Sequence, residues 1–439
     1  MRKVKALVLS VLASACGRFD SHTVSAKTEP DFAPALELAD EDTRAAGWND
    51  ARSVISGTKG GIFRYPSVAF RGEEFFVAGI DIADYSSDSV TASSLTIASS
   101  SGVKLNRPGG EWTFGYPRLA VDGLNRIHLI WAESSQRSVS VSATRWPSRP
   151  MTSIWDSTLD NRNRWSEPVC IVRGKHIDWG FHFDGFTSRS VDGPAIIATR
   201  WSERGETPVP LLLVLGDSSW RVLPSPVLFR RGLGSAYVST VSAVGFADSE
   251  IVLATLSDDG NGEEVLATQS LKYPSNSLGA NRLATTWSNP EVHAVAGRSQ
   301  TIVDVVLTVS SLGIANVGWV QSQIEGSSKL EFRSRSLNSE RWKVRPFLLI
   351  KGRPTSIHAI SNSVNDIFVV FGPDPYKDEQ VLIRGAILSS TWSEIPALFR
   401  AAEGRDVALF NSPKGEQLLV FTRTAGGKVR TYWSVFTHR

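Results

Sequence analysis

Arginine residues recur at the start of several predicted strands, three of them directly after a glycine. The residues that share this position are Arg64, Arg298, Arg353 and Arg405. If these strands are the innermost strands of their sheets, the guanidinium groups converge at one mouth of a central channel. A guanidinium presents a planar fork of donors that suits carboxylate, phosphate or sulfate. The pattern therefore predicts an anion-binding mouth, and the alternative is that Gly-Arg marks solvated turns.

A second polar group follows in the segment His176-Ile177-Asp178-Trp179, which we expect at the same mouth. His176, Asp178 and Trp179 could line a sugar pocket. We expect His176 and Asp178 to lie in a turn, so their spacing fixes no tight ligand geometry and we predict no metal site. The sequence has no P-loop, dinucleotide fingerprint, His-Glu-x-x-His or Gly-x-Ser-x-Gly motif, so no cofactor is predicted.

Tryptophan marks the repeating unit that must position these side chains. A tryptophan with a proline shortly after it opens an apolar strand at Trp165, Trp220, Trp287, Trp342 and Trp392. The units recur every roughly 50 to 67 residues and contain strand patterns only, which is typical of β-propeller blades. We expect each of these rings to pack between neighbouring sheets.

The strand patterns predict an all-β chain that forms a β-propeller of four-stranded blades. Seven sets of three strands each follow a tryptophan strand. The last set lacks a fourth strand, and residues 51–56 form a strand that precedes the first set. Pairing of this N-terminal strand with the last blade would close the ring and remove both exposed edges. Seven blades are favoured, and six is the alternative because the unit at Trp112 is incomplete.

The N-terminal segment predicts export. Residues 1–16 contain basic residues, a short apolar stretch, small residues and then Cys16. This segment resembles a bacterial lipoprotein signal, which implies a lipid on Cys16 and an outer-membrane lipoprotein of the cell envelope. Ordinary cleavage, which would give a periplasmic or secreted protein, is the alternative. Residues 17–47 are expected to form a flexible tether, and residues 48–439 the propeller.

The net charge and the cysteine content bear on which partners the chain can bind and on whether it can form disulfides. The formal net charge of +3 suggests no nucleic-acid partner, and we expect a monomer. Only 2 cysteines occur, and one of them lies in the export signal. No intrachain disulfide framework is therefore possible. Cys170, within an apolar run, is expected to be a buried structural thiol.

The segment Ile62-Phe63-Arg64-Tyr65-Pro66 resembles the Phe-Arg-Ile-Pro motif that opens the first blade of sialidases. The resemblance implies that Arg64 binds a sugar carboxylate and that Asp88 is the acid/base. Residues 158–165 resemble a degenerate Asp-box, a folding turn of the same superfamily. In sialidases the nucleophile is a tyrosine in the inner strand of the last blade, but residues 405–411 have no tyrosine, and Tyr432 lies two strands later.

Two functional hypotheses remain. The first is a non-catalytic propeller that recognises an anionic carbohydrate or a cell-surface protein at its channel mouth. The second is a glycoside hydrolase of exo-α-sialidase type. The missing tyrosine favours the first hypothesis, and the spacing of Arg64 and Asp88 favours the second.

Overall fold

The computed structural model describes the strands of residues 52–436 and many of their turns. The described residues are 52–56, 62–82, 85–86, 89–90, 93–100, 117–122, 124–134, 152–174, 177–178, 195–201, 208–215, 219–223, 237–247, 250–258, 263–272, 287–297, 299–310, 312–323, 327–336, 339, 341–345, 347–351, 354, 357–361, 367–371, 383–387, 391–394, 407–412, 416–425 and 428–436. These residues contain strands and turns and no helix. No helix among them is long and apolar enough to cross a membrane.

The described strands form seven antiparallel sheets of three to five strands, which we number in chain order, and one small hairpin. Sheet 1 contains β2 (Ile62–Arg71), β3 (Glu74–Ile82) and β6 (Ser93–Ser99). The separate hairpin of β4 (Tyr85–Ser86) and β5 (Ser89–Val90) lies between β3 and β6 in the sequence. Sheet 2 contains β7 (Arg118–Val121), β8 (Ile127–Ser134), β9 (Thr152–Leu159) and β10 (Val169–Gly174). Sheet 3 contains β11 (Ile177–Asp178), β12 (Ala195–Trp201), β13 (Pro208–Leu215) and β14 (Trp220–Val222).

The remaining sheets repeat the same order. Sheet 4 contains β15 (Tyr237–Ala247), β16 (Glu250–Asp258), β17 (Glu264–Lys272) and β18 (Glu291–Ala296). Sheet 5 contains β19 (Gln300–Val309), β20 (Ile314–Gln323), β21 (Ser327–Ser336) and both β22 (Lys343–Val344) and β23 (Leu348–Lys351), which pair with β21. Sheet 6 contains β24 (Ile357–Ser361), β25 (Ile367–Phe371), β26 (Ile383–Ile387) and β27 (Thr391–Glu394). Sheet 7 contains β28 (Val407–Asn411), β29 (Gln417–Ala425), β30 (Lys428–Phe436) and β1 (Arg52–Ser56).

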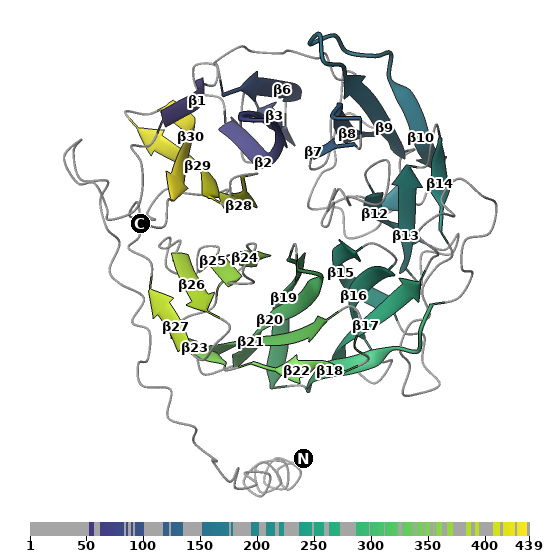
Figure 1. Ribbon diagram of the computed structural model, residues 1–439, viewed down its shortest axis with the longest axis vertical. Coiled ribbons are helices and arrows are strands. Elements are labelled where there is room, and N and C mark those ends of the chain that lie inside the picture. The colour runs from purple at the N-terminus through teal and green to yellow at the C-terminus, as the bar shows by residue number, and fades with distance from the viewer. Residues whose placement is uncertain are drawn as a thin grey trace, which may run out of the picture.

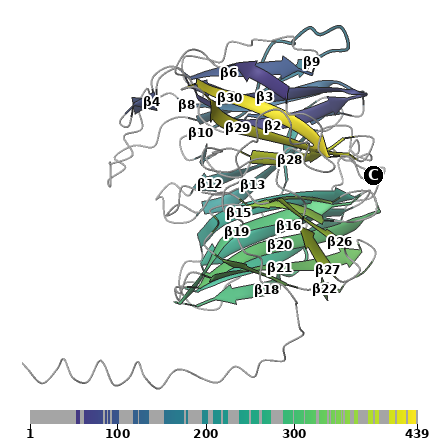
Figure 2. The ribbon, with the colours of Figure 1, turned by 90° about the vertical axis from the view of Figure 1, so that its left-hand side faces the viewer.

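The sheets are arranged around a common centre, which is the architecture of a β-propeller (Figure 1). The strands β2, β7, β15, β19, β24 and β28 lie nearest the centre, and β10, β14, β18, β22 and β27 lie toward the outside. The N-terminal strand β1 pairs with β30, with Arg52 opposite Trp433 and Ser56 opposite Arg430. Figure 2 shows sheets 1 and 7, the purple and yellow strands, side by side.

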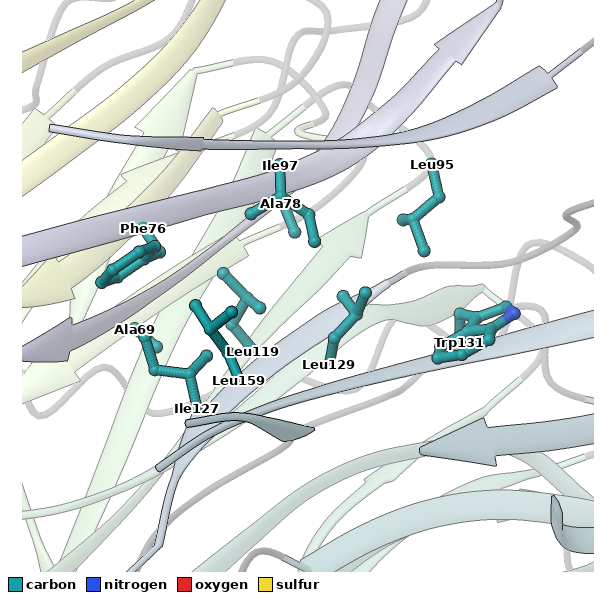
Figure 3. Packing of buried hydrophobic residues seen from close by; sticks show 10 residues of the cluster. All are labelled: Ala69, Phe76, Ala78, Leu95, Ile97, Leu119, Ile127, Leu129, Trp131 and Leu159. Atoms are coloured by element: carbon teal, nitrogen blue, oxygen red, sulfur yellow. The ribbon is translucent and has the colours of Figure 1, made fainter. Parts of the chain in front are cut away.

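Both faces of sheet 1 are buried, because side chains on a strand alternate between its two faces. Phe76 and Ala78 of β3 pack toward Leu119 and Leu129 of sheet 2 (Figure 3). The alternate β3 residues, Phe75 and Val77, pack with Leu418 and Val420 of sheet 7. This double burial explains why the strand sequences read as nearly continuous apolar runs.

The recurring tryptophans pack between neighbouring sheets, as predicted, at three described positions. Trp165 packs against the core between sheets 1 and 2. Trp220 packs against the core between sheets 2 and 3, and Trp342 against the core between sheets 4 and 5. Their role is structural, because each ring fills the space left between two diverging sheets.

A serine follows three of the recurring tryptophans, Trp165, Trp287 and Trp392, and two of these serines make the same pair of hydrogen bonds. Ser166 makes two hydrogen bonds with the backbone of Thr158. The Thr158 N–H donates to Ser166 Oγ at 2.9 Å, and the Ser166 N–H donates to the Thr158 carbonyl at 2.8 Å. Ser288 makes the same two bonds with Ser270, at the same lengths. The motif therefore fastens the outer edge of a sheet to its third strand.

The burial expected for Cys170 is wrong, because Cys170 is exposed. It lies on β10, the outer strand of sheet 2, where the register with β9 shifts between Cys170 and Val172. An apolar run on an outer strand has no neighbouring strand beyond it, so it is not evidence of burial. Desolvation nevertheless raises the pKa of the thiol, which keeps it protonated at neutral pH.

Candidate functional site

The starts of the innermost strands bring the candidate residues toward one end of the ring. Each sheet begins with its innermost strand and continues outward as an antiparallel meander, so equivalent strands point the same way around the ring. Arg118 is the first residue of β7, Arg64 the third of β2, and His358 the second of β24. These backbone positions are the structural basis for a site at the centre.

Side-chain to backbone hydrogen bonds hold neighbouring inner strands in place. Ser67 Oγ on β2 accepts from the backbone N–H of Leu119 on β7 at 2.9 Å. Asp304 Oδ2 on β19 accepts from the N–H of Ile357 on β24 at 2.9 Å. Asn411 Nδ2, which ends β28, donates to the carbonyl of Ser361 at 2.7 Å. The Asp304 bond fixes the residue next to His358, so that β24 enters the centre in a defined position.

His358 and Arg118 share one electrostatic environment. Desolvation by the surrounding protein, assisted by the charge of Arg118, lowers the pKa of His358 to about 4. The side chain of His358 is nevertheless exposed to solvent. Because Arg118 belongs to sheet 2 and His358 to sheet 6, which are not neighbours in the ring, the effect acts across the centre.

The chemistry available at this point follows from the two charge states. At neutral pH the imidazole of His358 is uncharged, with one donor and one acceptor nitrogen, and Arg118 is a cation. A cation in a desolvated channel attracts carboxylate, sulfate or phosphate. The pair can bind and orient an anionic group.

Most of the site residues predicted from the sequence lie outside the described residues. These residues are Cys16, Asp88, His176, Trp179, Arg298, Arg353 and Arg405. Arg64 and Asp178 are placed by their backbones only, in β2 and β11. The anion-binding mouth built from these arginines therefore stays a prediction.

The turn expected around Asp178 is wrong. Asp178 lies in β11, paired with Thr199, and Ile177 pairs with Arg200. The polar and aromatic residues of this segment break the apolar alternation that is typical of a strand. Backbone hydrogen bonds to β12 determine the conformation here despite that composition.

The register of sheet 1 places the β4–β5 hairpin at the same end as Arg64. Ile62 pairs with Ile82, and Ile82 pairs with Ser93, so the hairpin between β3 and β6 leaves the sheet where β2 begins. Asp88 lies between β4 and β5 in the sequence. The role of Asp88 as the acid/base therefore stays a prediction.

The last sheet has no tyrosine on its innermost strand. The sequence of β28 is Val-Ala-Leu-Phe-Asn. Tyr432 lies on β30, where it pairs with Ser53 of β1 and Phe421 of β29. It is therefore two strands away from the centre of the ring.

Sequence reasoning missed Arg118 and His358. A signal for Arg118 was present: Tyr116-Pro117 precedes it, and Tyr65-Pro66 stands at the start of the preceding inner strand. His358 lies on the inner strand β24, and its proximity to a cation from another sheet depends on how the sheets are arranged in space. No local pattern could have revealed that proximity.

No protein-family model and no curated protein matches the sequence. Similar solved structures include the α-L-arabinanase of Penicillium chrysogenum complexed with arabinobiose, at 15% identity and a TM-score of 0.46, covering 74% of this chain and 93% of that chain. A Dyadobacter fermentans protein of unknown function has 12% identity and a TM-score of 0.48, and the match covers 89% of this chain and 99% of that chain. Trypanosoma rangeli sialidase in complex with sialic acid has 8% identity and a TM-score of 0.47, and the match covers 91% of this chain and 59% of that chain. Likeness at this level assigns neither activity nor residue roles to this chain.

Proposed function

We propose that this chain is a binding protein that recognises an anionic carbohydrate or protein at the mouth of its propeller channel, without catalysis. The observation that carries the proposal is that Arg118, the first residue of β7, and His358 on β24 lie close enough at the centre for the Arg118 charge to act on the imidazole. Positive potential in a concave, desolvated site raises the local concentration of anions and strengthens their hydrogen bonds. Arg64, Arg298, Arg353 and Arg405 would extend this potential around the mouth.

The scaffold proposed for this site is a closed ring of seven four-stranded blades. Two contacts support closure: the pairing of β1 with β30, and the core that Val68 and Phe75 of sheet 1 form with Leu418 and Val420 of sheet 7. The seven described sheets support the blade number. A closed ring gives a rigid mouth, because every blade packs against a neighbouring blade on both of its faces.

Glycoside hydrolysis of exo-α-sialidase type is the second candidate function. The observation in its favour is the β4–β5 hairpin, which lies at the Arg64 end of sheet 1. Retaining cleavage requires an acid and a nucleophile on either side of one anomeric carbon. Asp88 could supply the acid, but β28 offers no tyrosine, and this absence makes binding the preferred function.

The location proposed for this chain is the outer membrane of a bacterial envelope. Lipid on Cys16 would provide the anchor, residues 17–47 the tether, and the propeller would act as a monomer. A Cys16→Ser variant should leave the membrane fraction of the producing cell. Unchanged fractionation of that variant would show that the anchor is wrong, while leaving the channel site untested by the same experiment.

The binding proposal is tested with an acidic and a neutral sugar, sialyllactose and lactose, titrated calorimetrically into the purified propeller. Arg118→Ala should weaken the binding of sialyllactose by about 1.5 to 3 kcal/mol, the scale of a charge-assisted hydrogen bond. Arg162→Ala is the matched control, because Arg162 is exposed in a turn beyond β9. Equal affinity of the wild type for both sugars would overturn anion recognition. Rapid release of free sialic acid would establish the hydrolase instead.

A further inference from the structure

A buried histidine lies between two aspartates beside the contact of sheets 2 and 3. His128 Nδ1 is 3.0 Å from both carboxylate oxygens of Asp156, and its Nε2 is 3.3 Å from Asp122 Oδ2. Trp220, the first residue of β14 in sheet 3, donates from Nε1 to Asp156 Oδ2 at 3.0 Å. We call these four residues the His128 clasp. It connects β7, β8 and β9 to the next sheet along the ring.

The geometry requires both ring nitrogens of His128 to carry hydrogen. An ionised carboxylate can only accept hydrogen bonds, so a bare ring nitrogen facing one would place two lone pairs together. Both carboxylates also accept hydrogen bonds from other donors. Asp122 accepts from Arg126 Nε at 2.6 Å and from the backbone N–H groups of Leu124 and Arg126, and Asp156 accepts from Trp220. The arrangement is therefore complete only with a doubly protonated, cationic imidazole.

The charges of the group balance only in this state. The described charged groups that act on His128 are Asp122, beyond the end of β7, and Asp156, on β9. Arg126 pairs with Asp122 at 2.6 Å. Two carboxylates and two cations cancel, whereas loss of the imidazole proton leaves one buried negative charge without compensation. An uncompensated buried charge is strongly destabilising.

We propose that the His128 proton is a structural component of the joint between sheets 2 and 3, so that this joint opens at alkaline pH before the rest of the ring. The weak point is the contact of Asp156 with Trp220, because Asp156 is the carboxylate that reaches sheet 3. Arg126 still neutralises Asp122 after the proton is lost. Asp156 then keeps its charge, and its donors among the described residues are neutral ones, the Trp220 N–H and the one N–H that remains on His128.

The pH range follows from the hydrogen bonds. Burial alone would lower the pKa of His128, but the hydrogen bonds to Asp122 and Asp156 and their charges raise it to about 9. A raised histidine pKa stabilises the folded state fully below the unfolded value of about 6.5, and this contribution is lost as the pH rises to 9. The unfolding equilibrium constant should therefore increase roughly a hundredfold across this range through His128 alone.

The direct test is NMR of the full chain with histidine labelled at Cε1. The sequence has 7 histidines, and at pH 8 one resonance should keep the chemical shift of an imidazolium. That resonance should be absent from the spectrum of the His128→Gln variant. In Asp156→Asn it should titrate at lower pH, because one acceptor carboxylate is gone. If every histidine of the wild type is neutral at pH 8, the proposal is wrong, whatever the stability of the variants.

Hydrogen exchange locates the opening. Between pH 7 and pH 9.5, after correction for the intrinsic rate, peptides that cover β8, β9 and β14 should lose protection before those of β19 to β21. His293→Gln is the matched control, because His293 is also a buried histidine at a contact between sheets but is uncharged at neutral pH. It should keep the alkaline step of the wild type. Simultaneous loss of protection in all sheets would contradict a local joint.

Discussion

Arg71, at the end of β2 in sheet 1, is hydrogen-bonded to Asp160, which lies 89 residues later in a turn after β9 of sheet 2. Arg71 Nη1, at the end of β2, donates to the carbonyl oxygen of Asp160 at 3.0 Å, and Nη2 donates to Asn163 Oδ1 of the same turn at 2.6 Å. The turn itself is tight because Asp160 Oδ1 accepts from the N–H groups of Arg162 and Arg164. Asn163 adopts a φ of 57°, a conformation that asparagine tolerates better than most residues. One planar guanidinium thus recognises a preformed turn of the next sheet.

Replacement of Arg71 by alanine should lower the free energy of unfolding by about 1 to 3 kcal/mol, because two hydrogen bonds and a contact with the Phe76 ring are lost. Lysine should not restore the loss, since it lacks the fork. Chemical denaturation measures both variants. Arg162→Ala, in the same turn, is the control and should change stability little. Equal effects of the two alanine variants would refute the role of Arg71.

Substitution at Gly318 should be severely destabilising. A Cβ on this residue of β20 would collide with the ring of Phe332 on β21, which is itself fully buried. Gly318→Ala should cost about 2 to 4 kcal/mol through displacement of that ring. Gly297→Ala is the control, because nothing lies within 4 Å of its added Cβ. Thermal unfolding of both variants provides the comparison, and an unchanged melting temperature for Gly318→Ala would show that the packing is wrong.

Truncation tests the pairing of β1 with β30. Deletion of residues 430–439 removes most of β30 and leaves β1 without the partner that Arg52 to Ser56 have in the structure. We expect loss of cooperative unfolding for the whole domain, since both edges of the ring become exposed. Deletion of residues 437–439 alone, beyond β30, should be harmless. A single sharp transition at the original temperature after the longer deletion would exclude closure through this pair.

Acid should destabilise the contact between sheets 4 and 5 through His293. Burial, with the charges of Arg333 and Arg335, lowers the pKa of His293 to about 3. A lowered histidine pKa means that the unfolded chain binds more protons, so stability falls once the pH drops below about 6.5 and continues to fall toward 3. Between pH 7 and pH 4.5 the free energy of unfolding of the His293→Gln variant should fall by about 2 kcal/mol less than that of the wild type. The measurement is urea denaturation at both pH values, and parallel curves for the two proteins would contradict it.

Local pattern predicted much of the fold because propeller strands are short and repeat. The expected repetition of short strands occurs, as does the packing of Trp165, Trp220 and Trp342 between sheets. Apolar alternation and turn residues act over a few neighbours, so such features are visible in the sequence.

The errors came where a residue's environment depends on a partner distant in sequence. Cys170 lies in an apolar run, but its strand is at the outer edge of a sheet, and edge position is a property of topology. Asp178 lies in a polar segment, yet pairing with Thr199 makes it a strand residue. The electrostatic link between Arg118 and His358 and the His128 clasp each unite residues from different strands. No spacing rule reveals a contact that only the assembled sheets create.

The pairing of β1 with β30 also means that the two ends of the folded chain meet in one sheet. A chain with adjacent ends can be joined by a short linker and cut elsewhere without removing any strand. New termini between β14 and β15 would leave every described strand pair intact. The order in which the sheets are synthesised would change, while the ring itself would stay the same. Such a circular permutant should therefore keep the channel, and with it any ligand bound there.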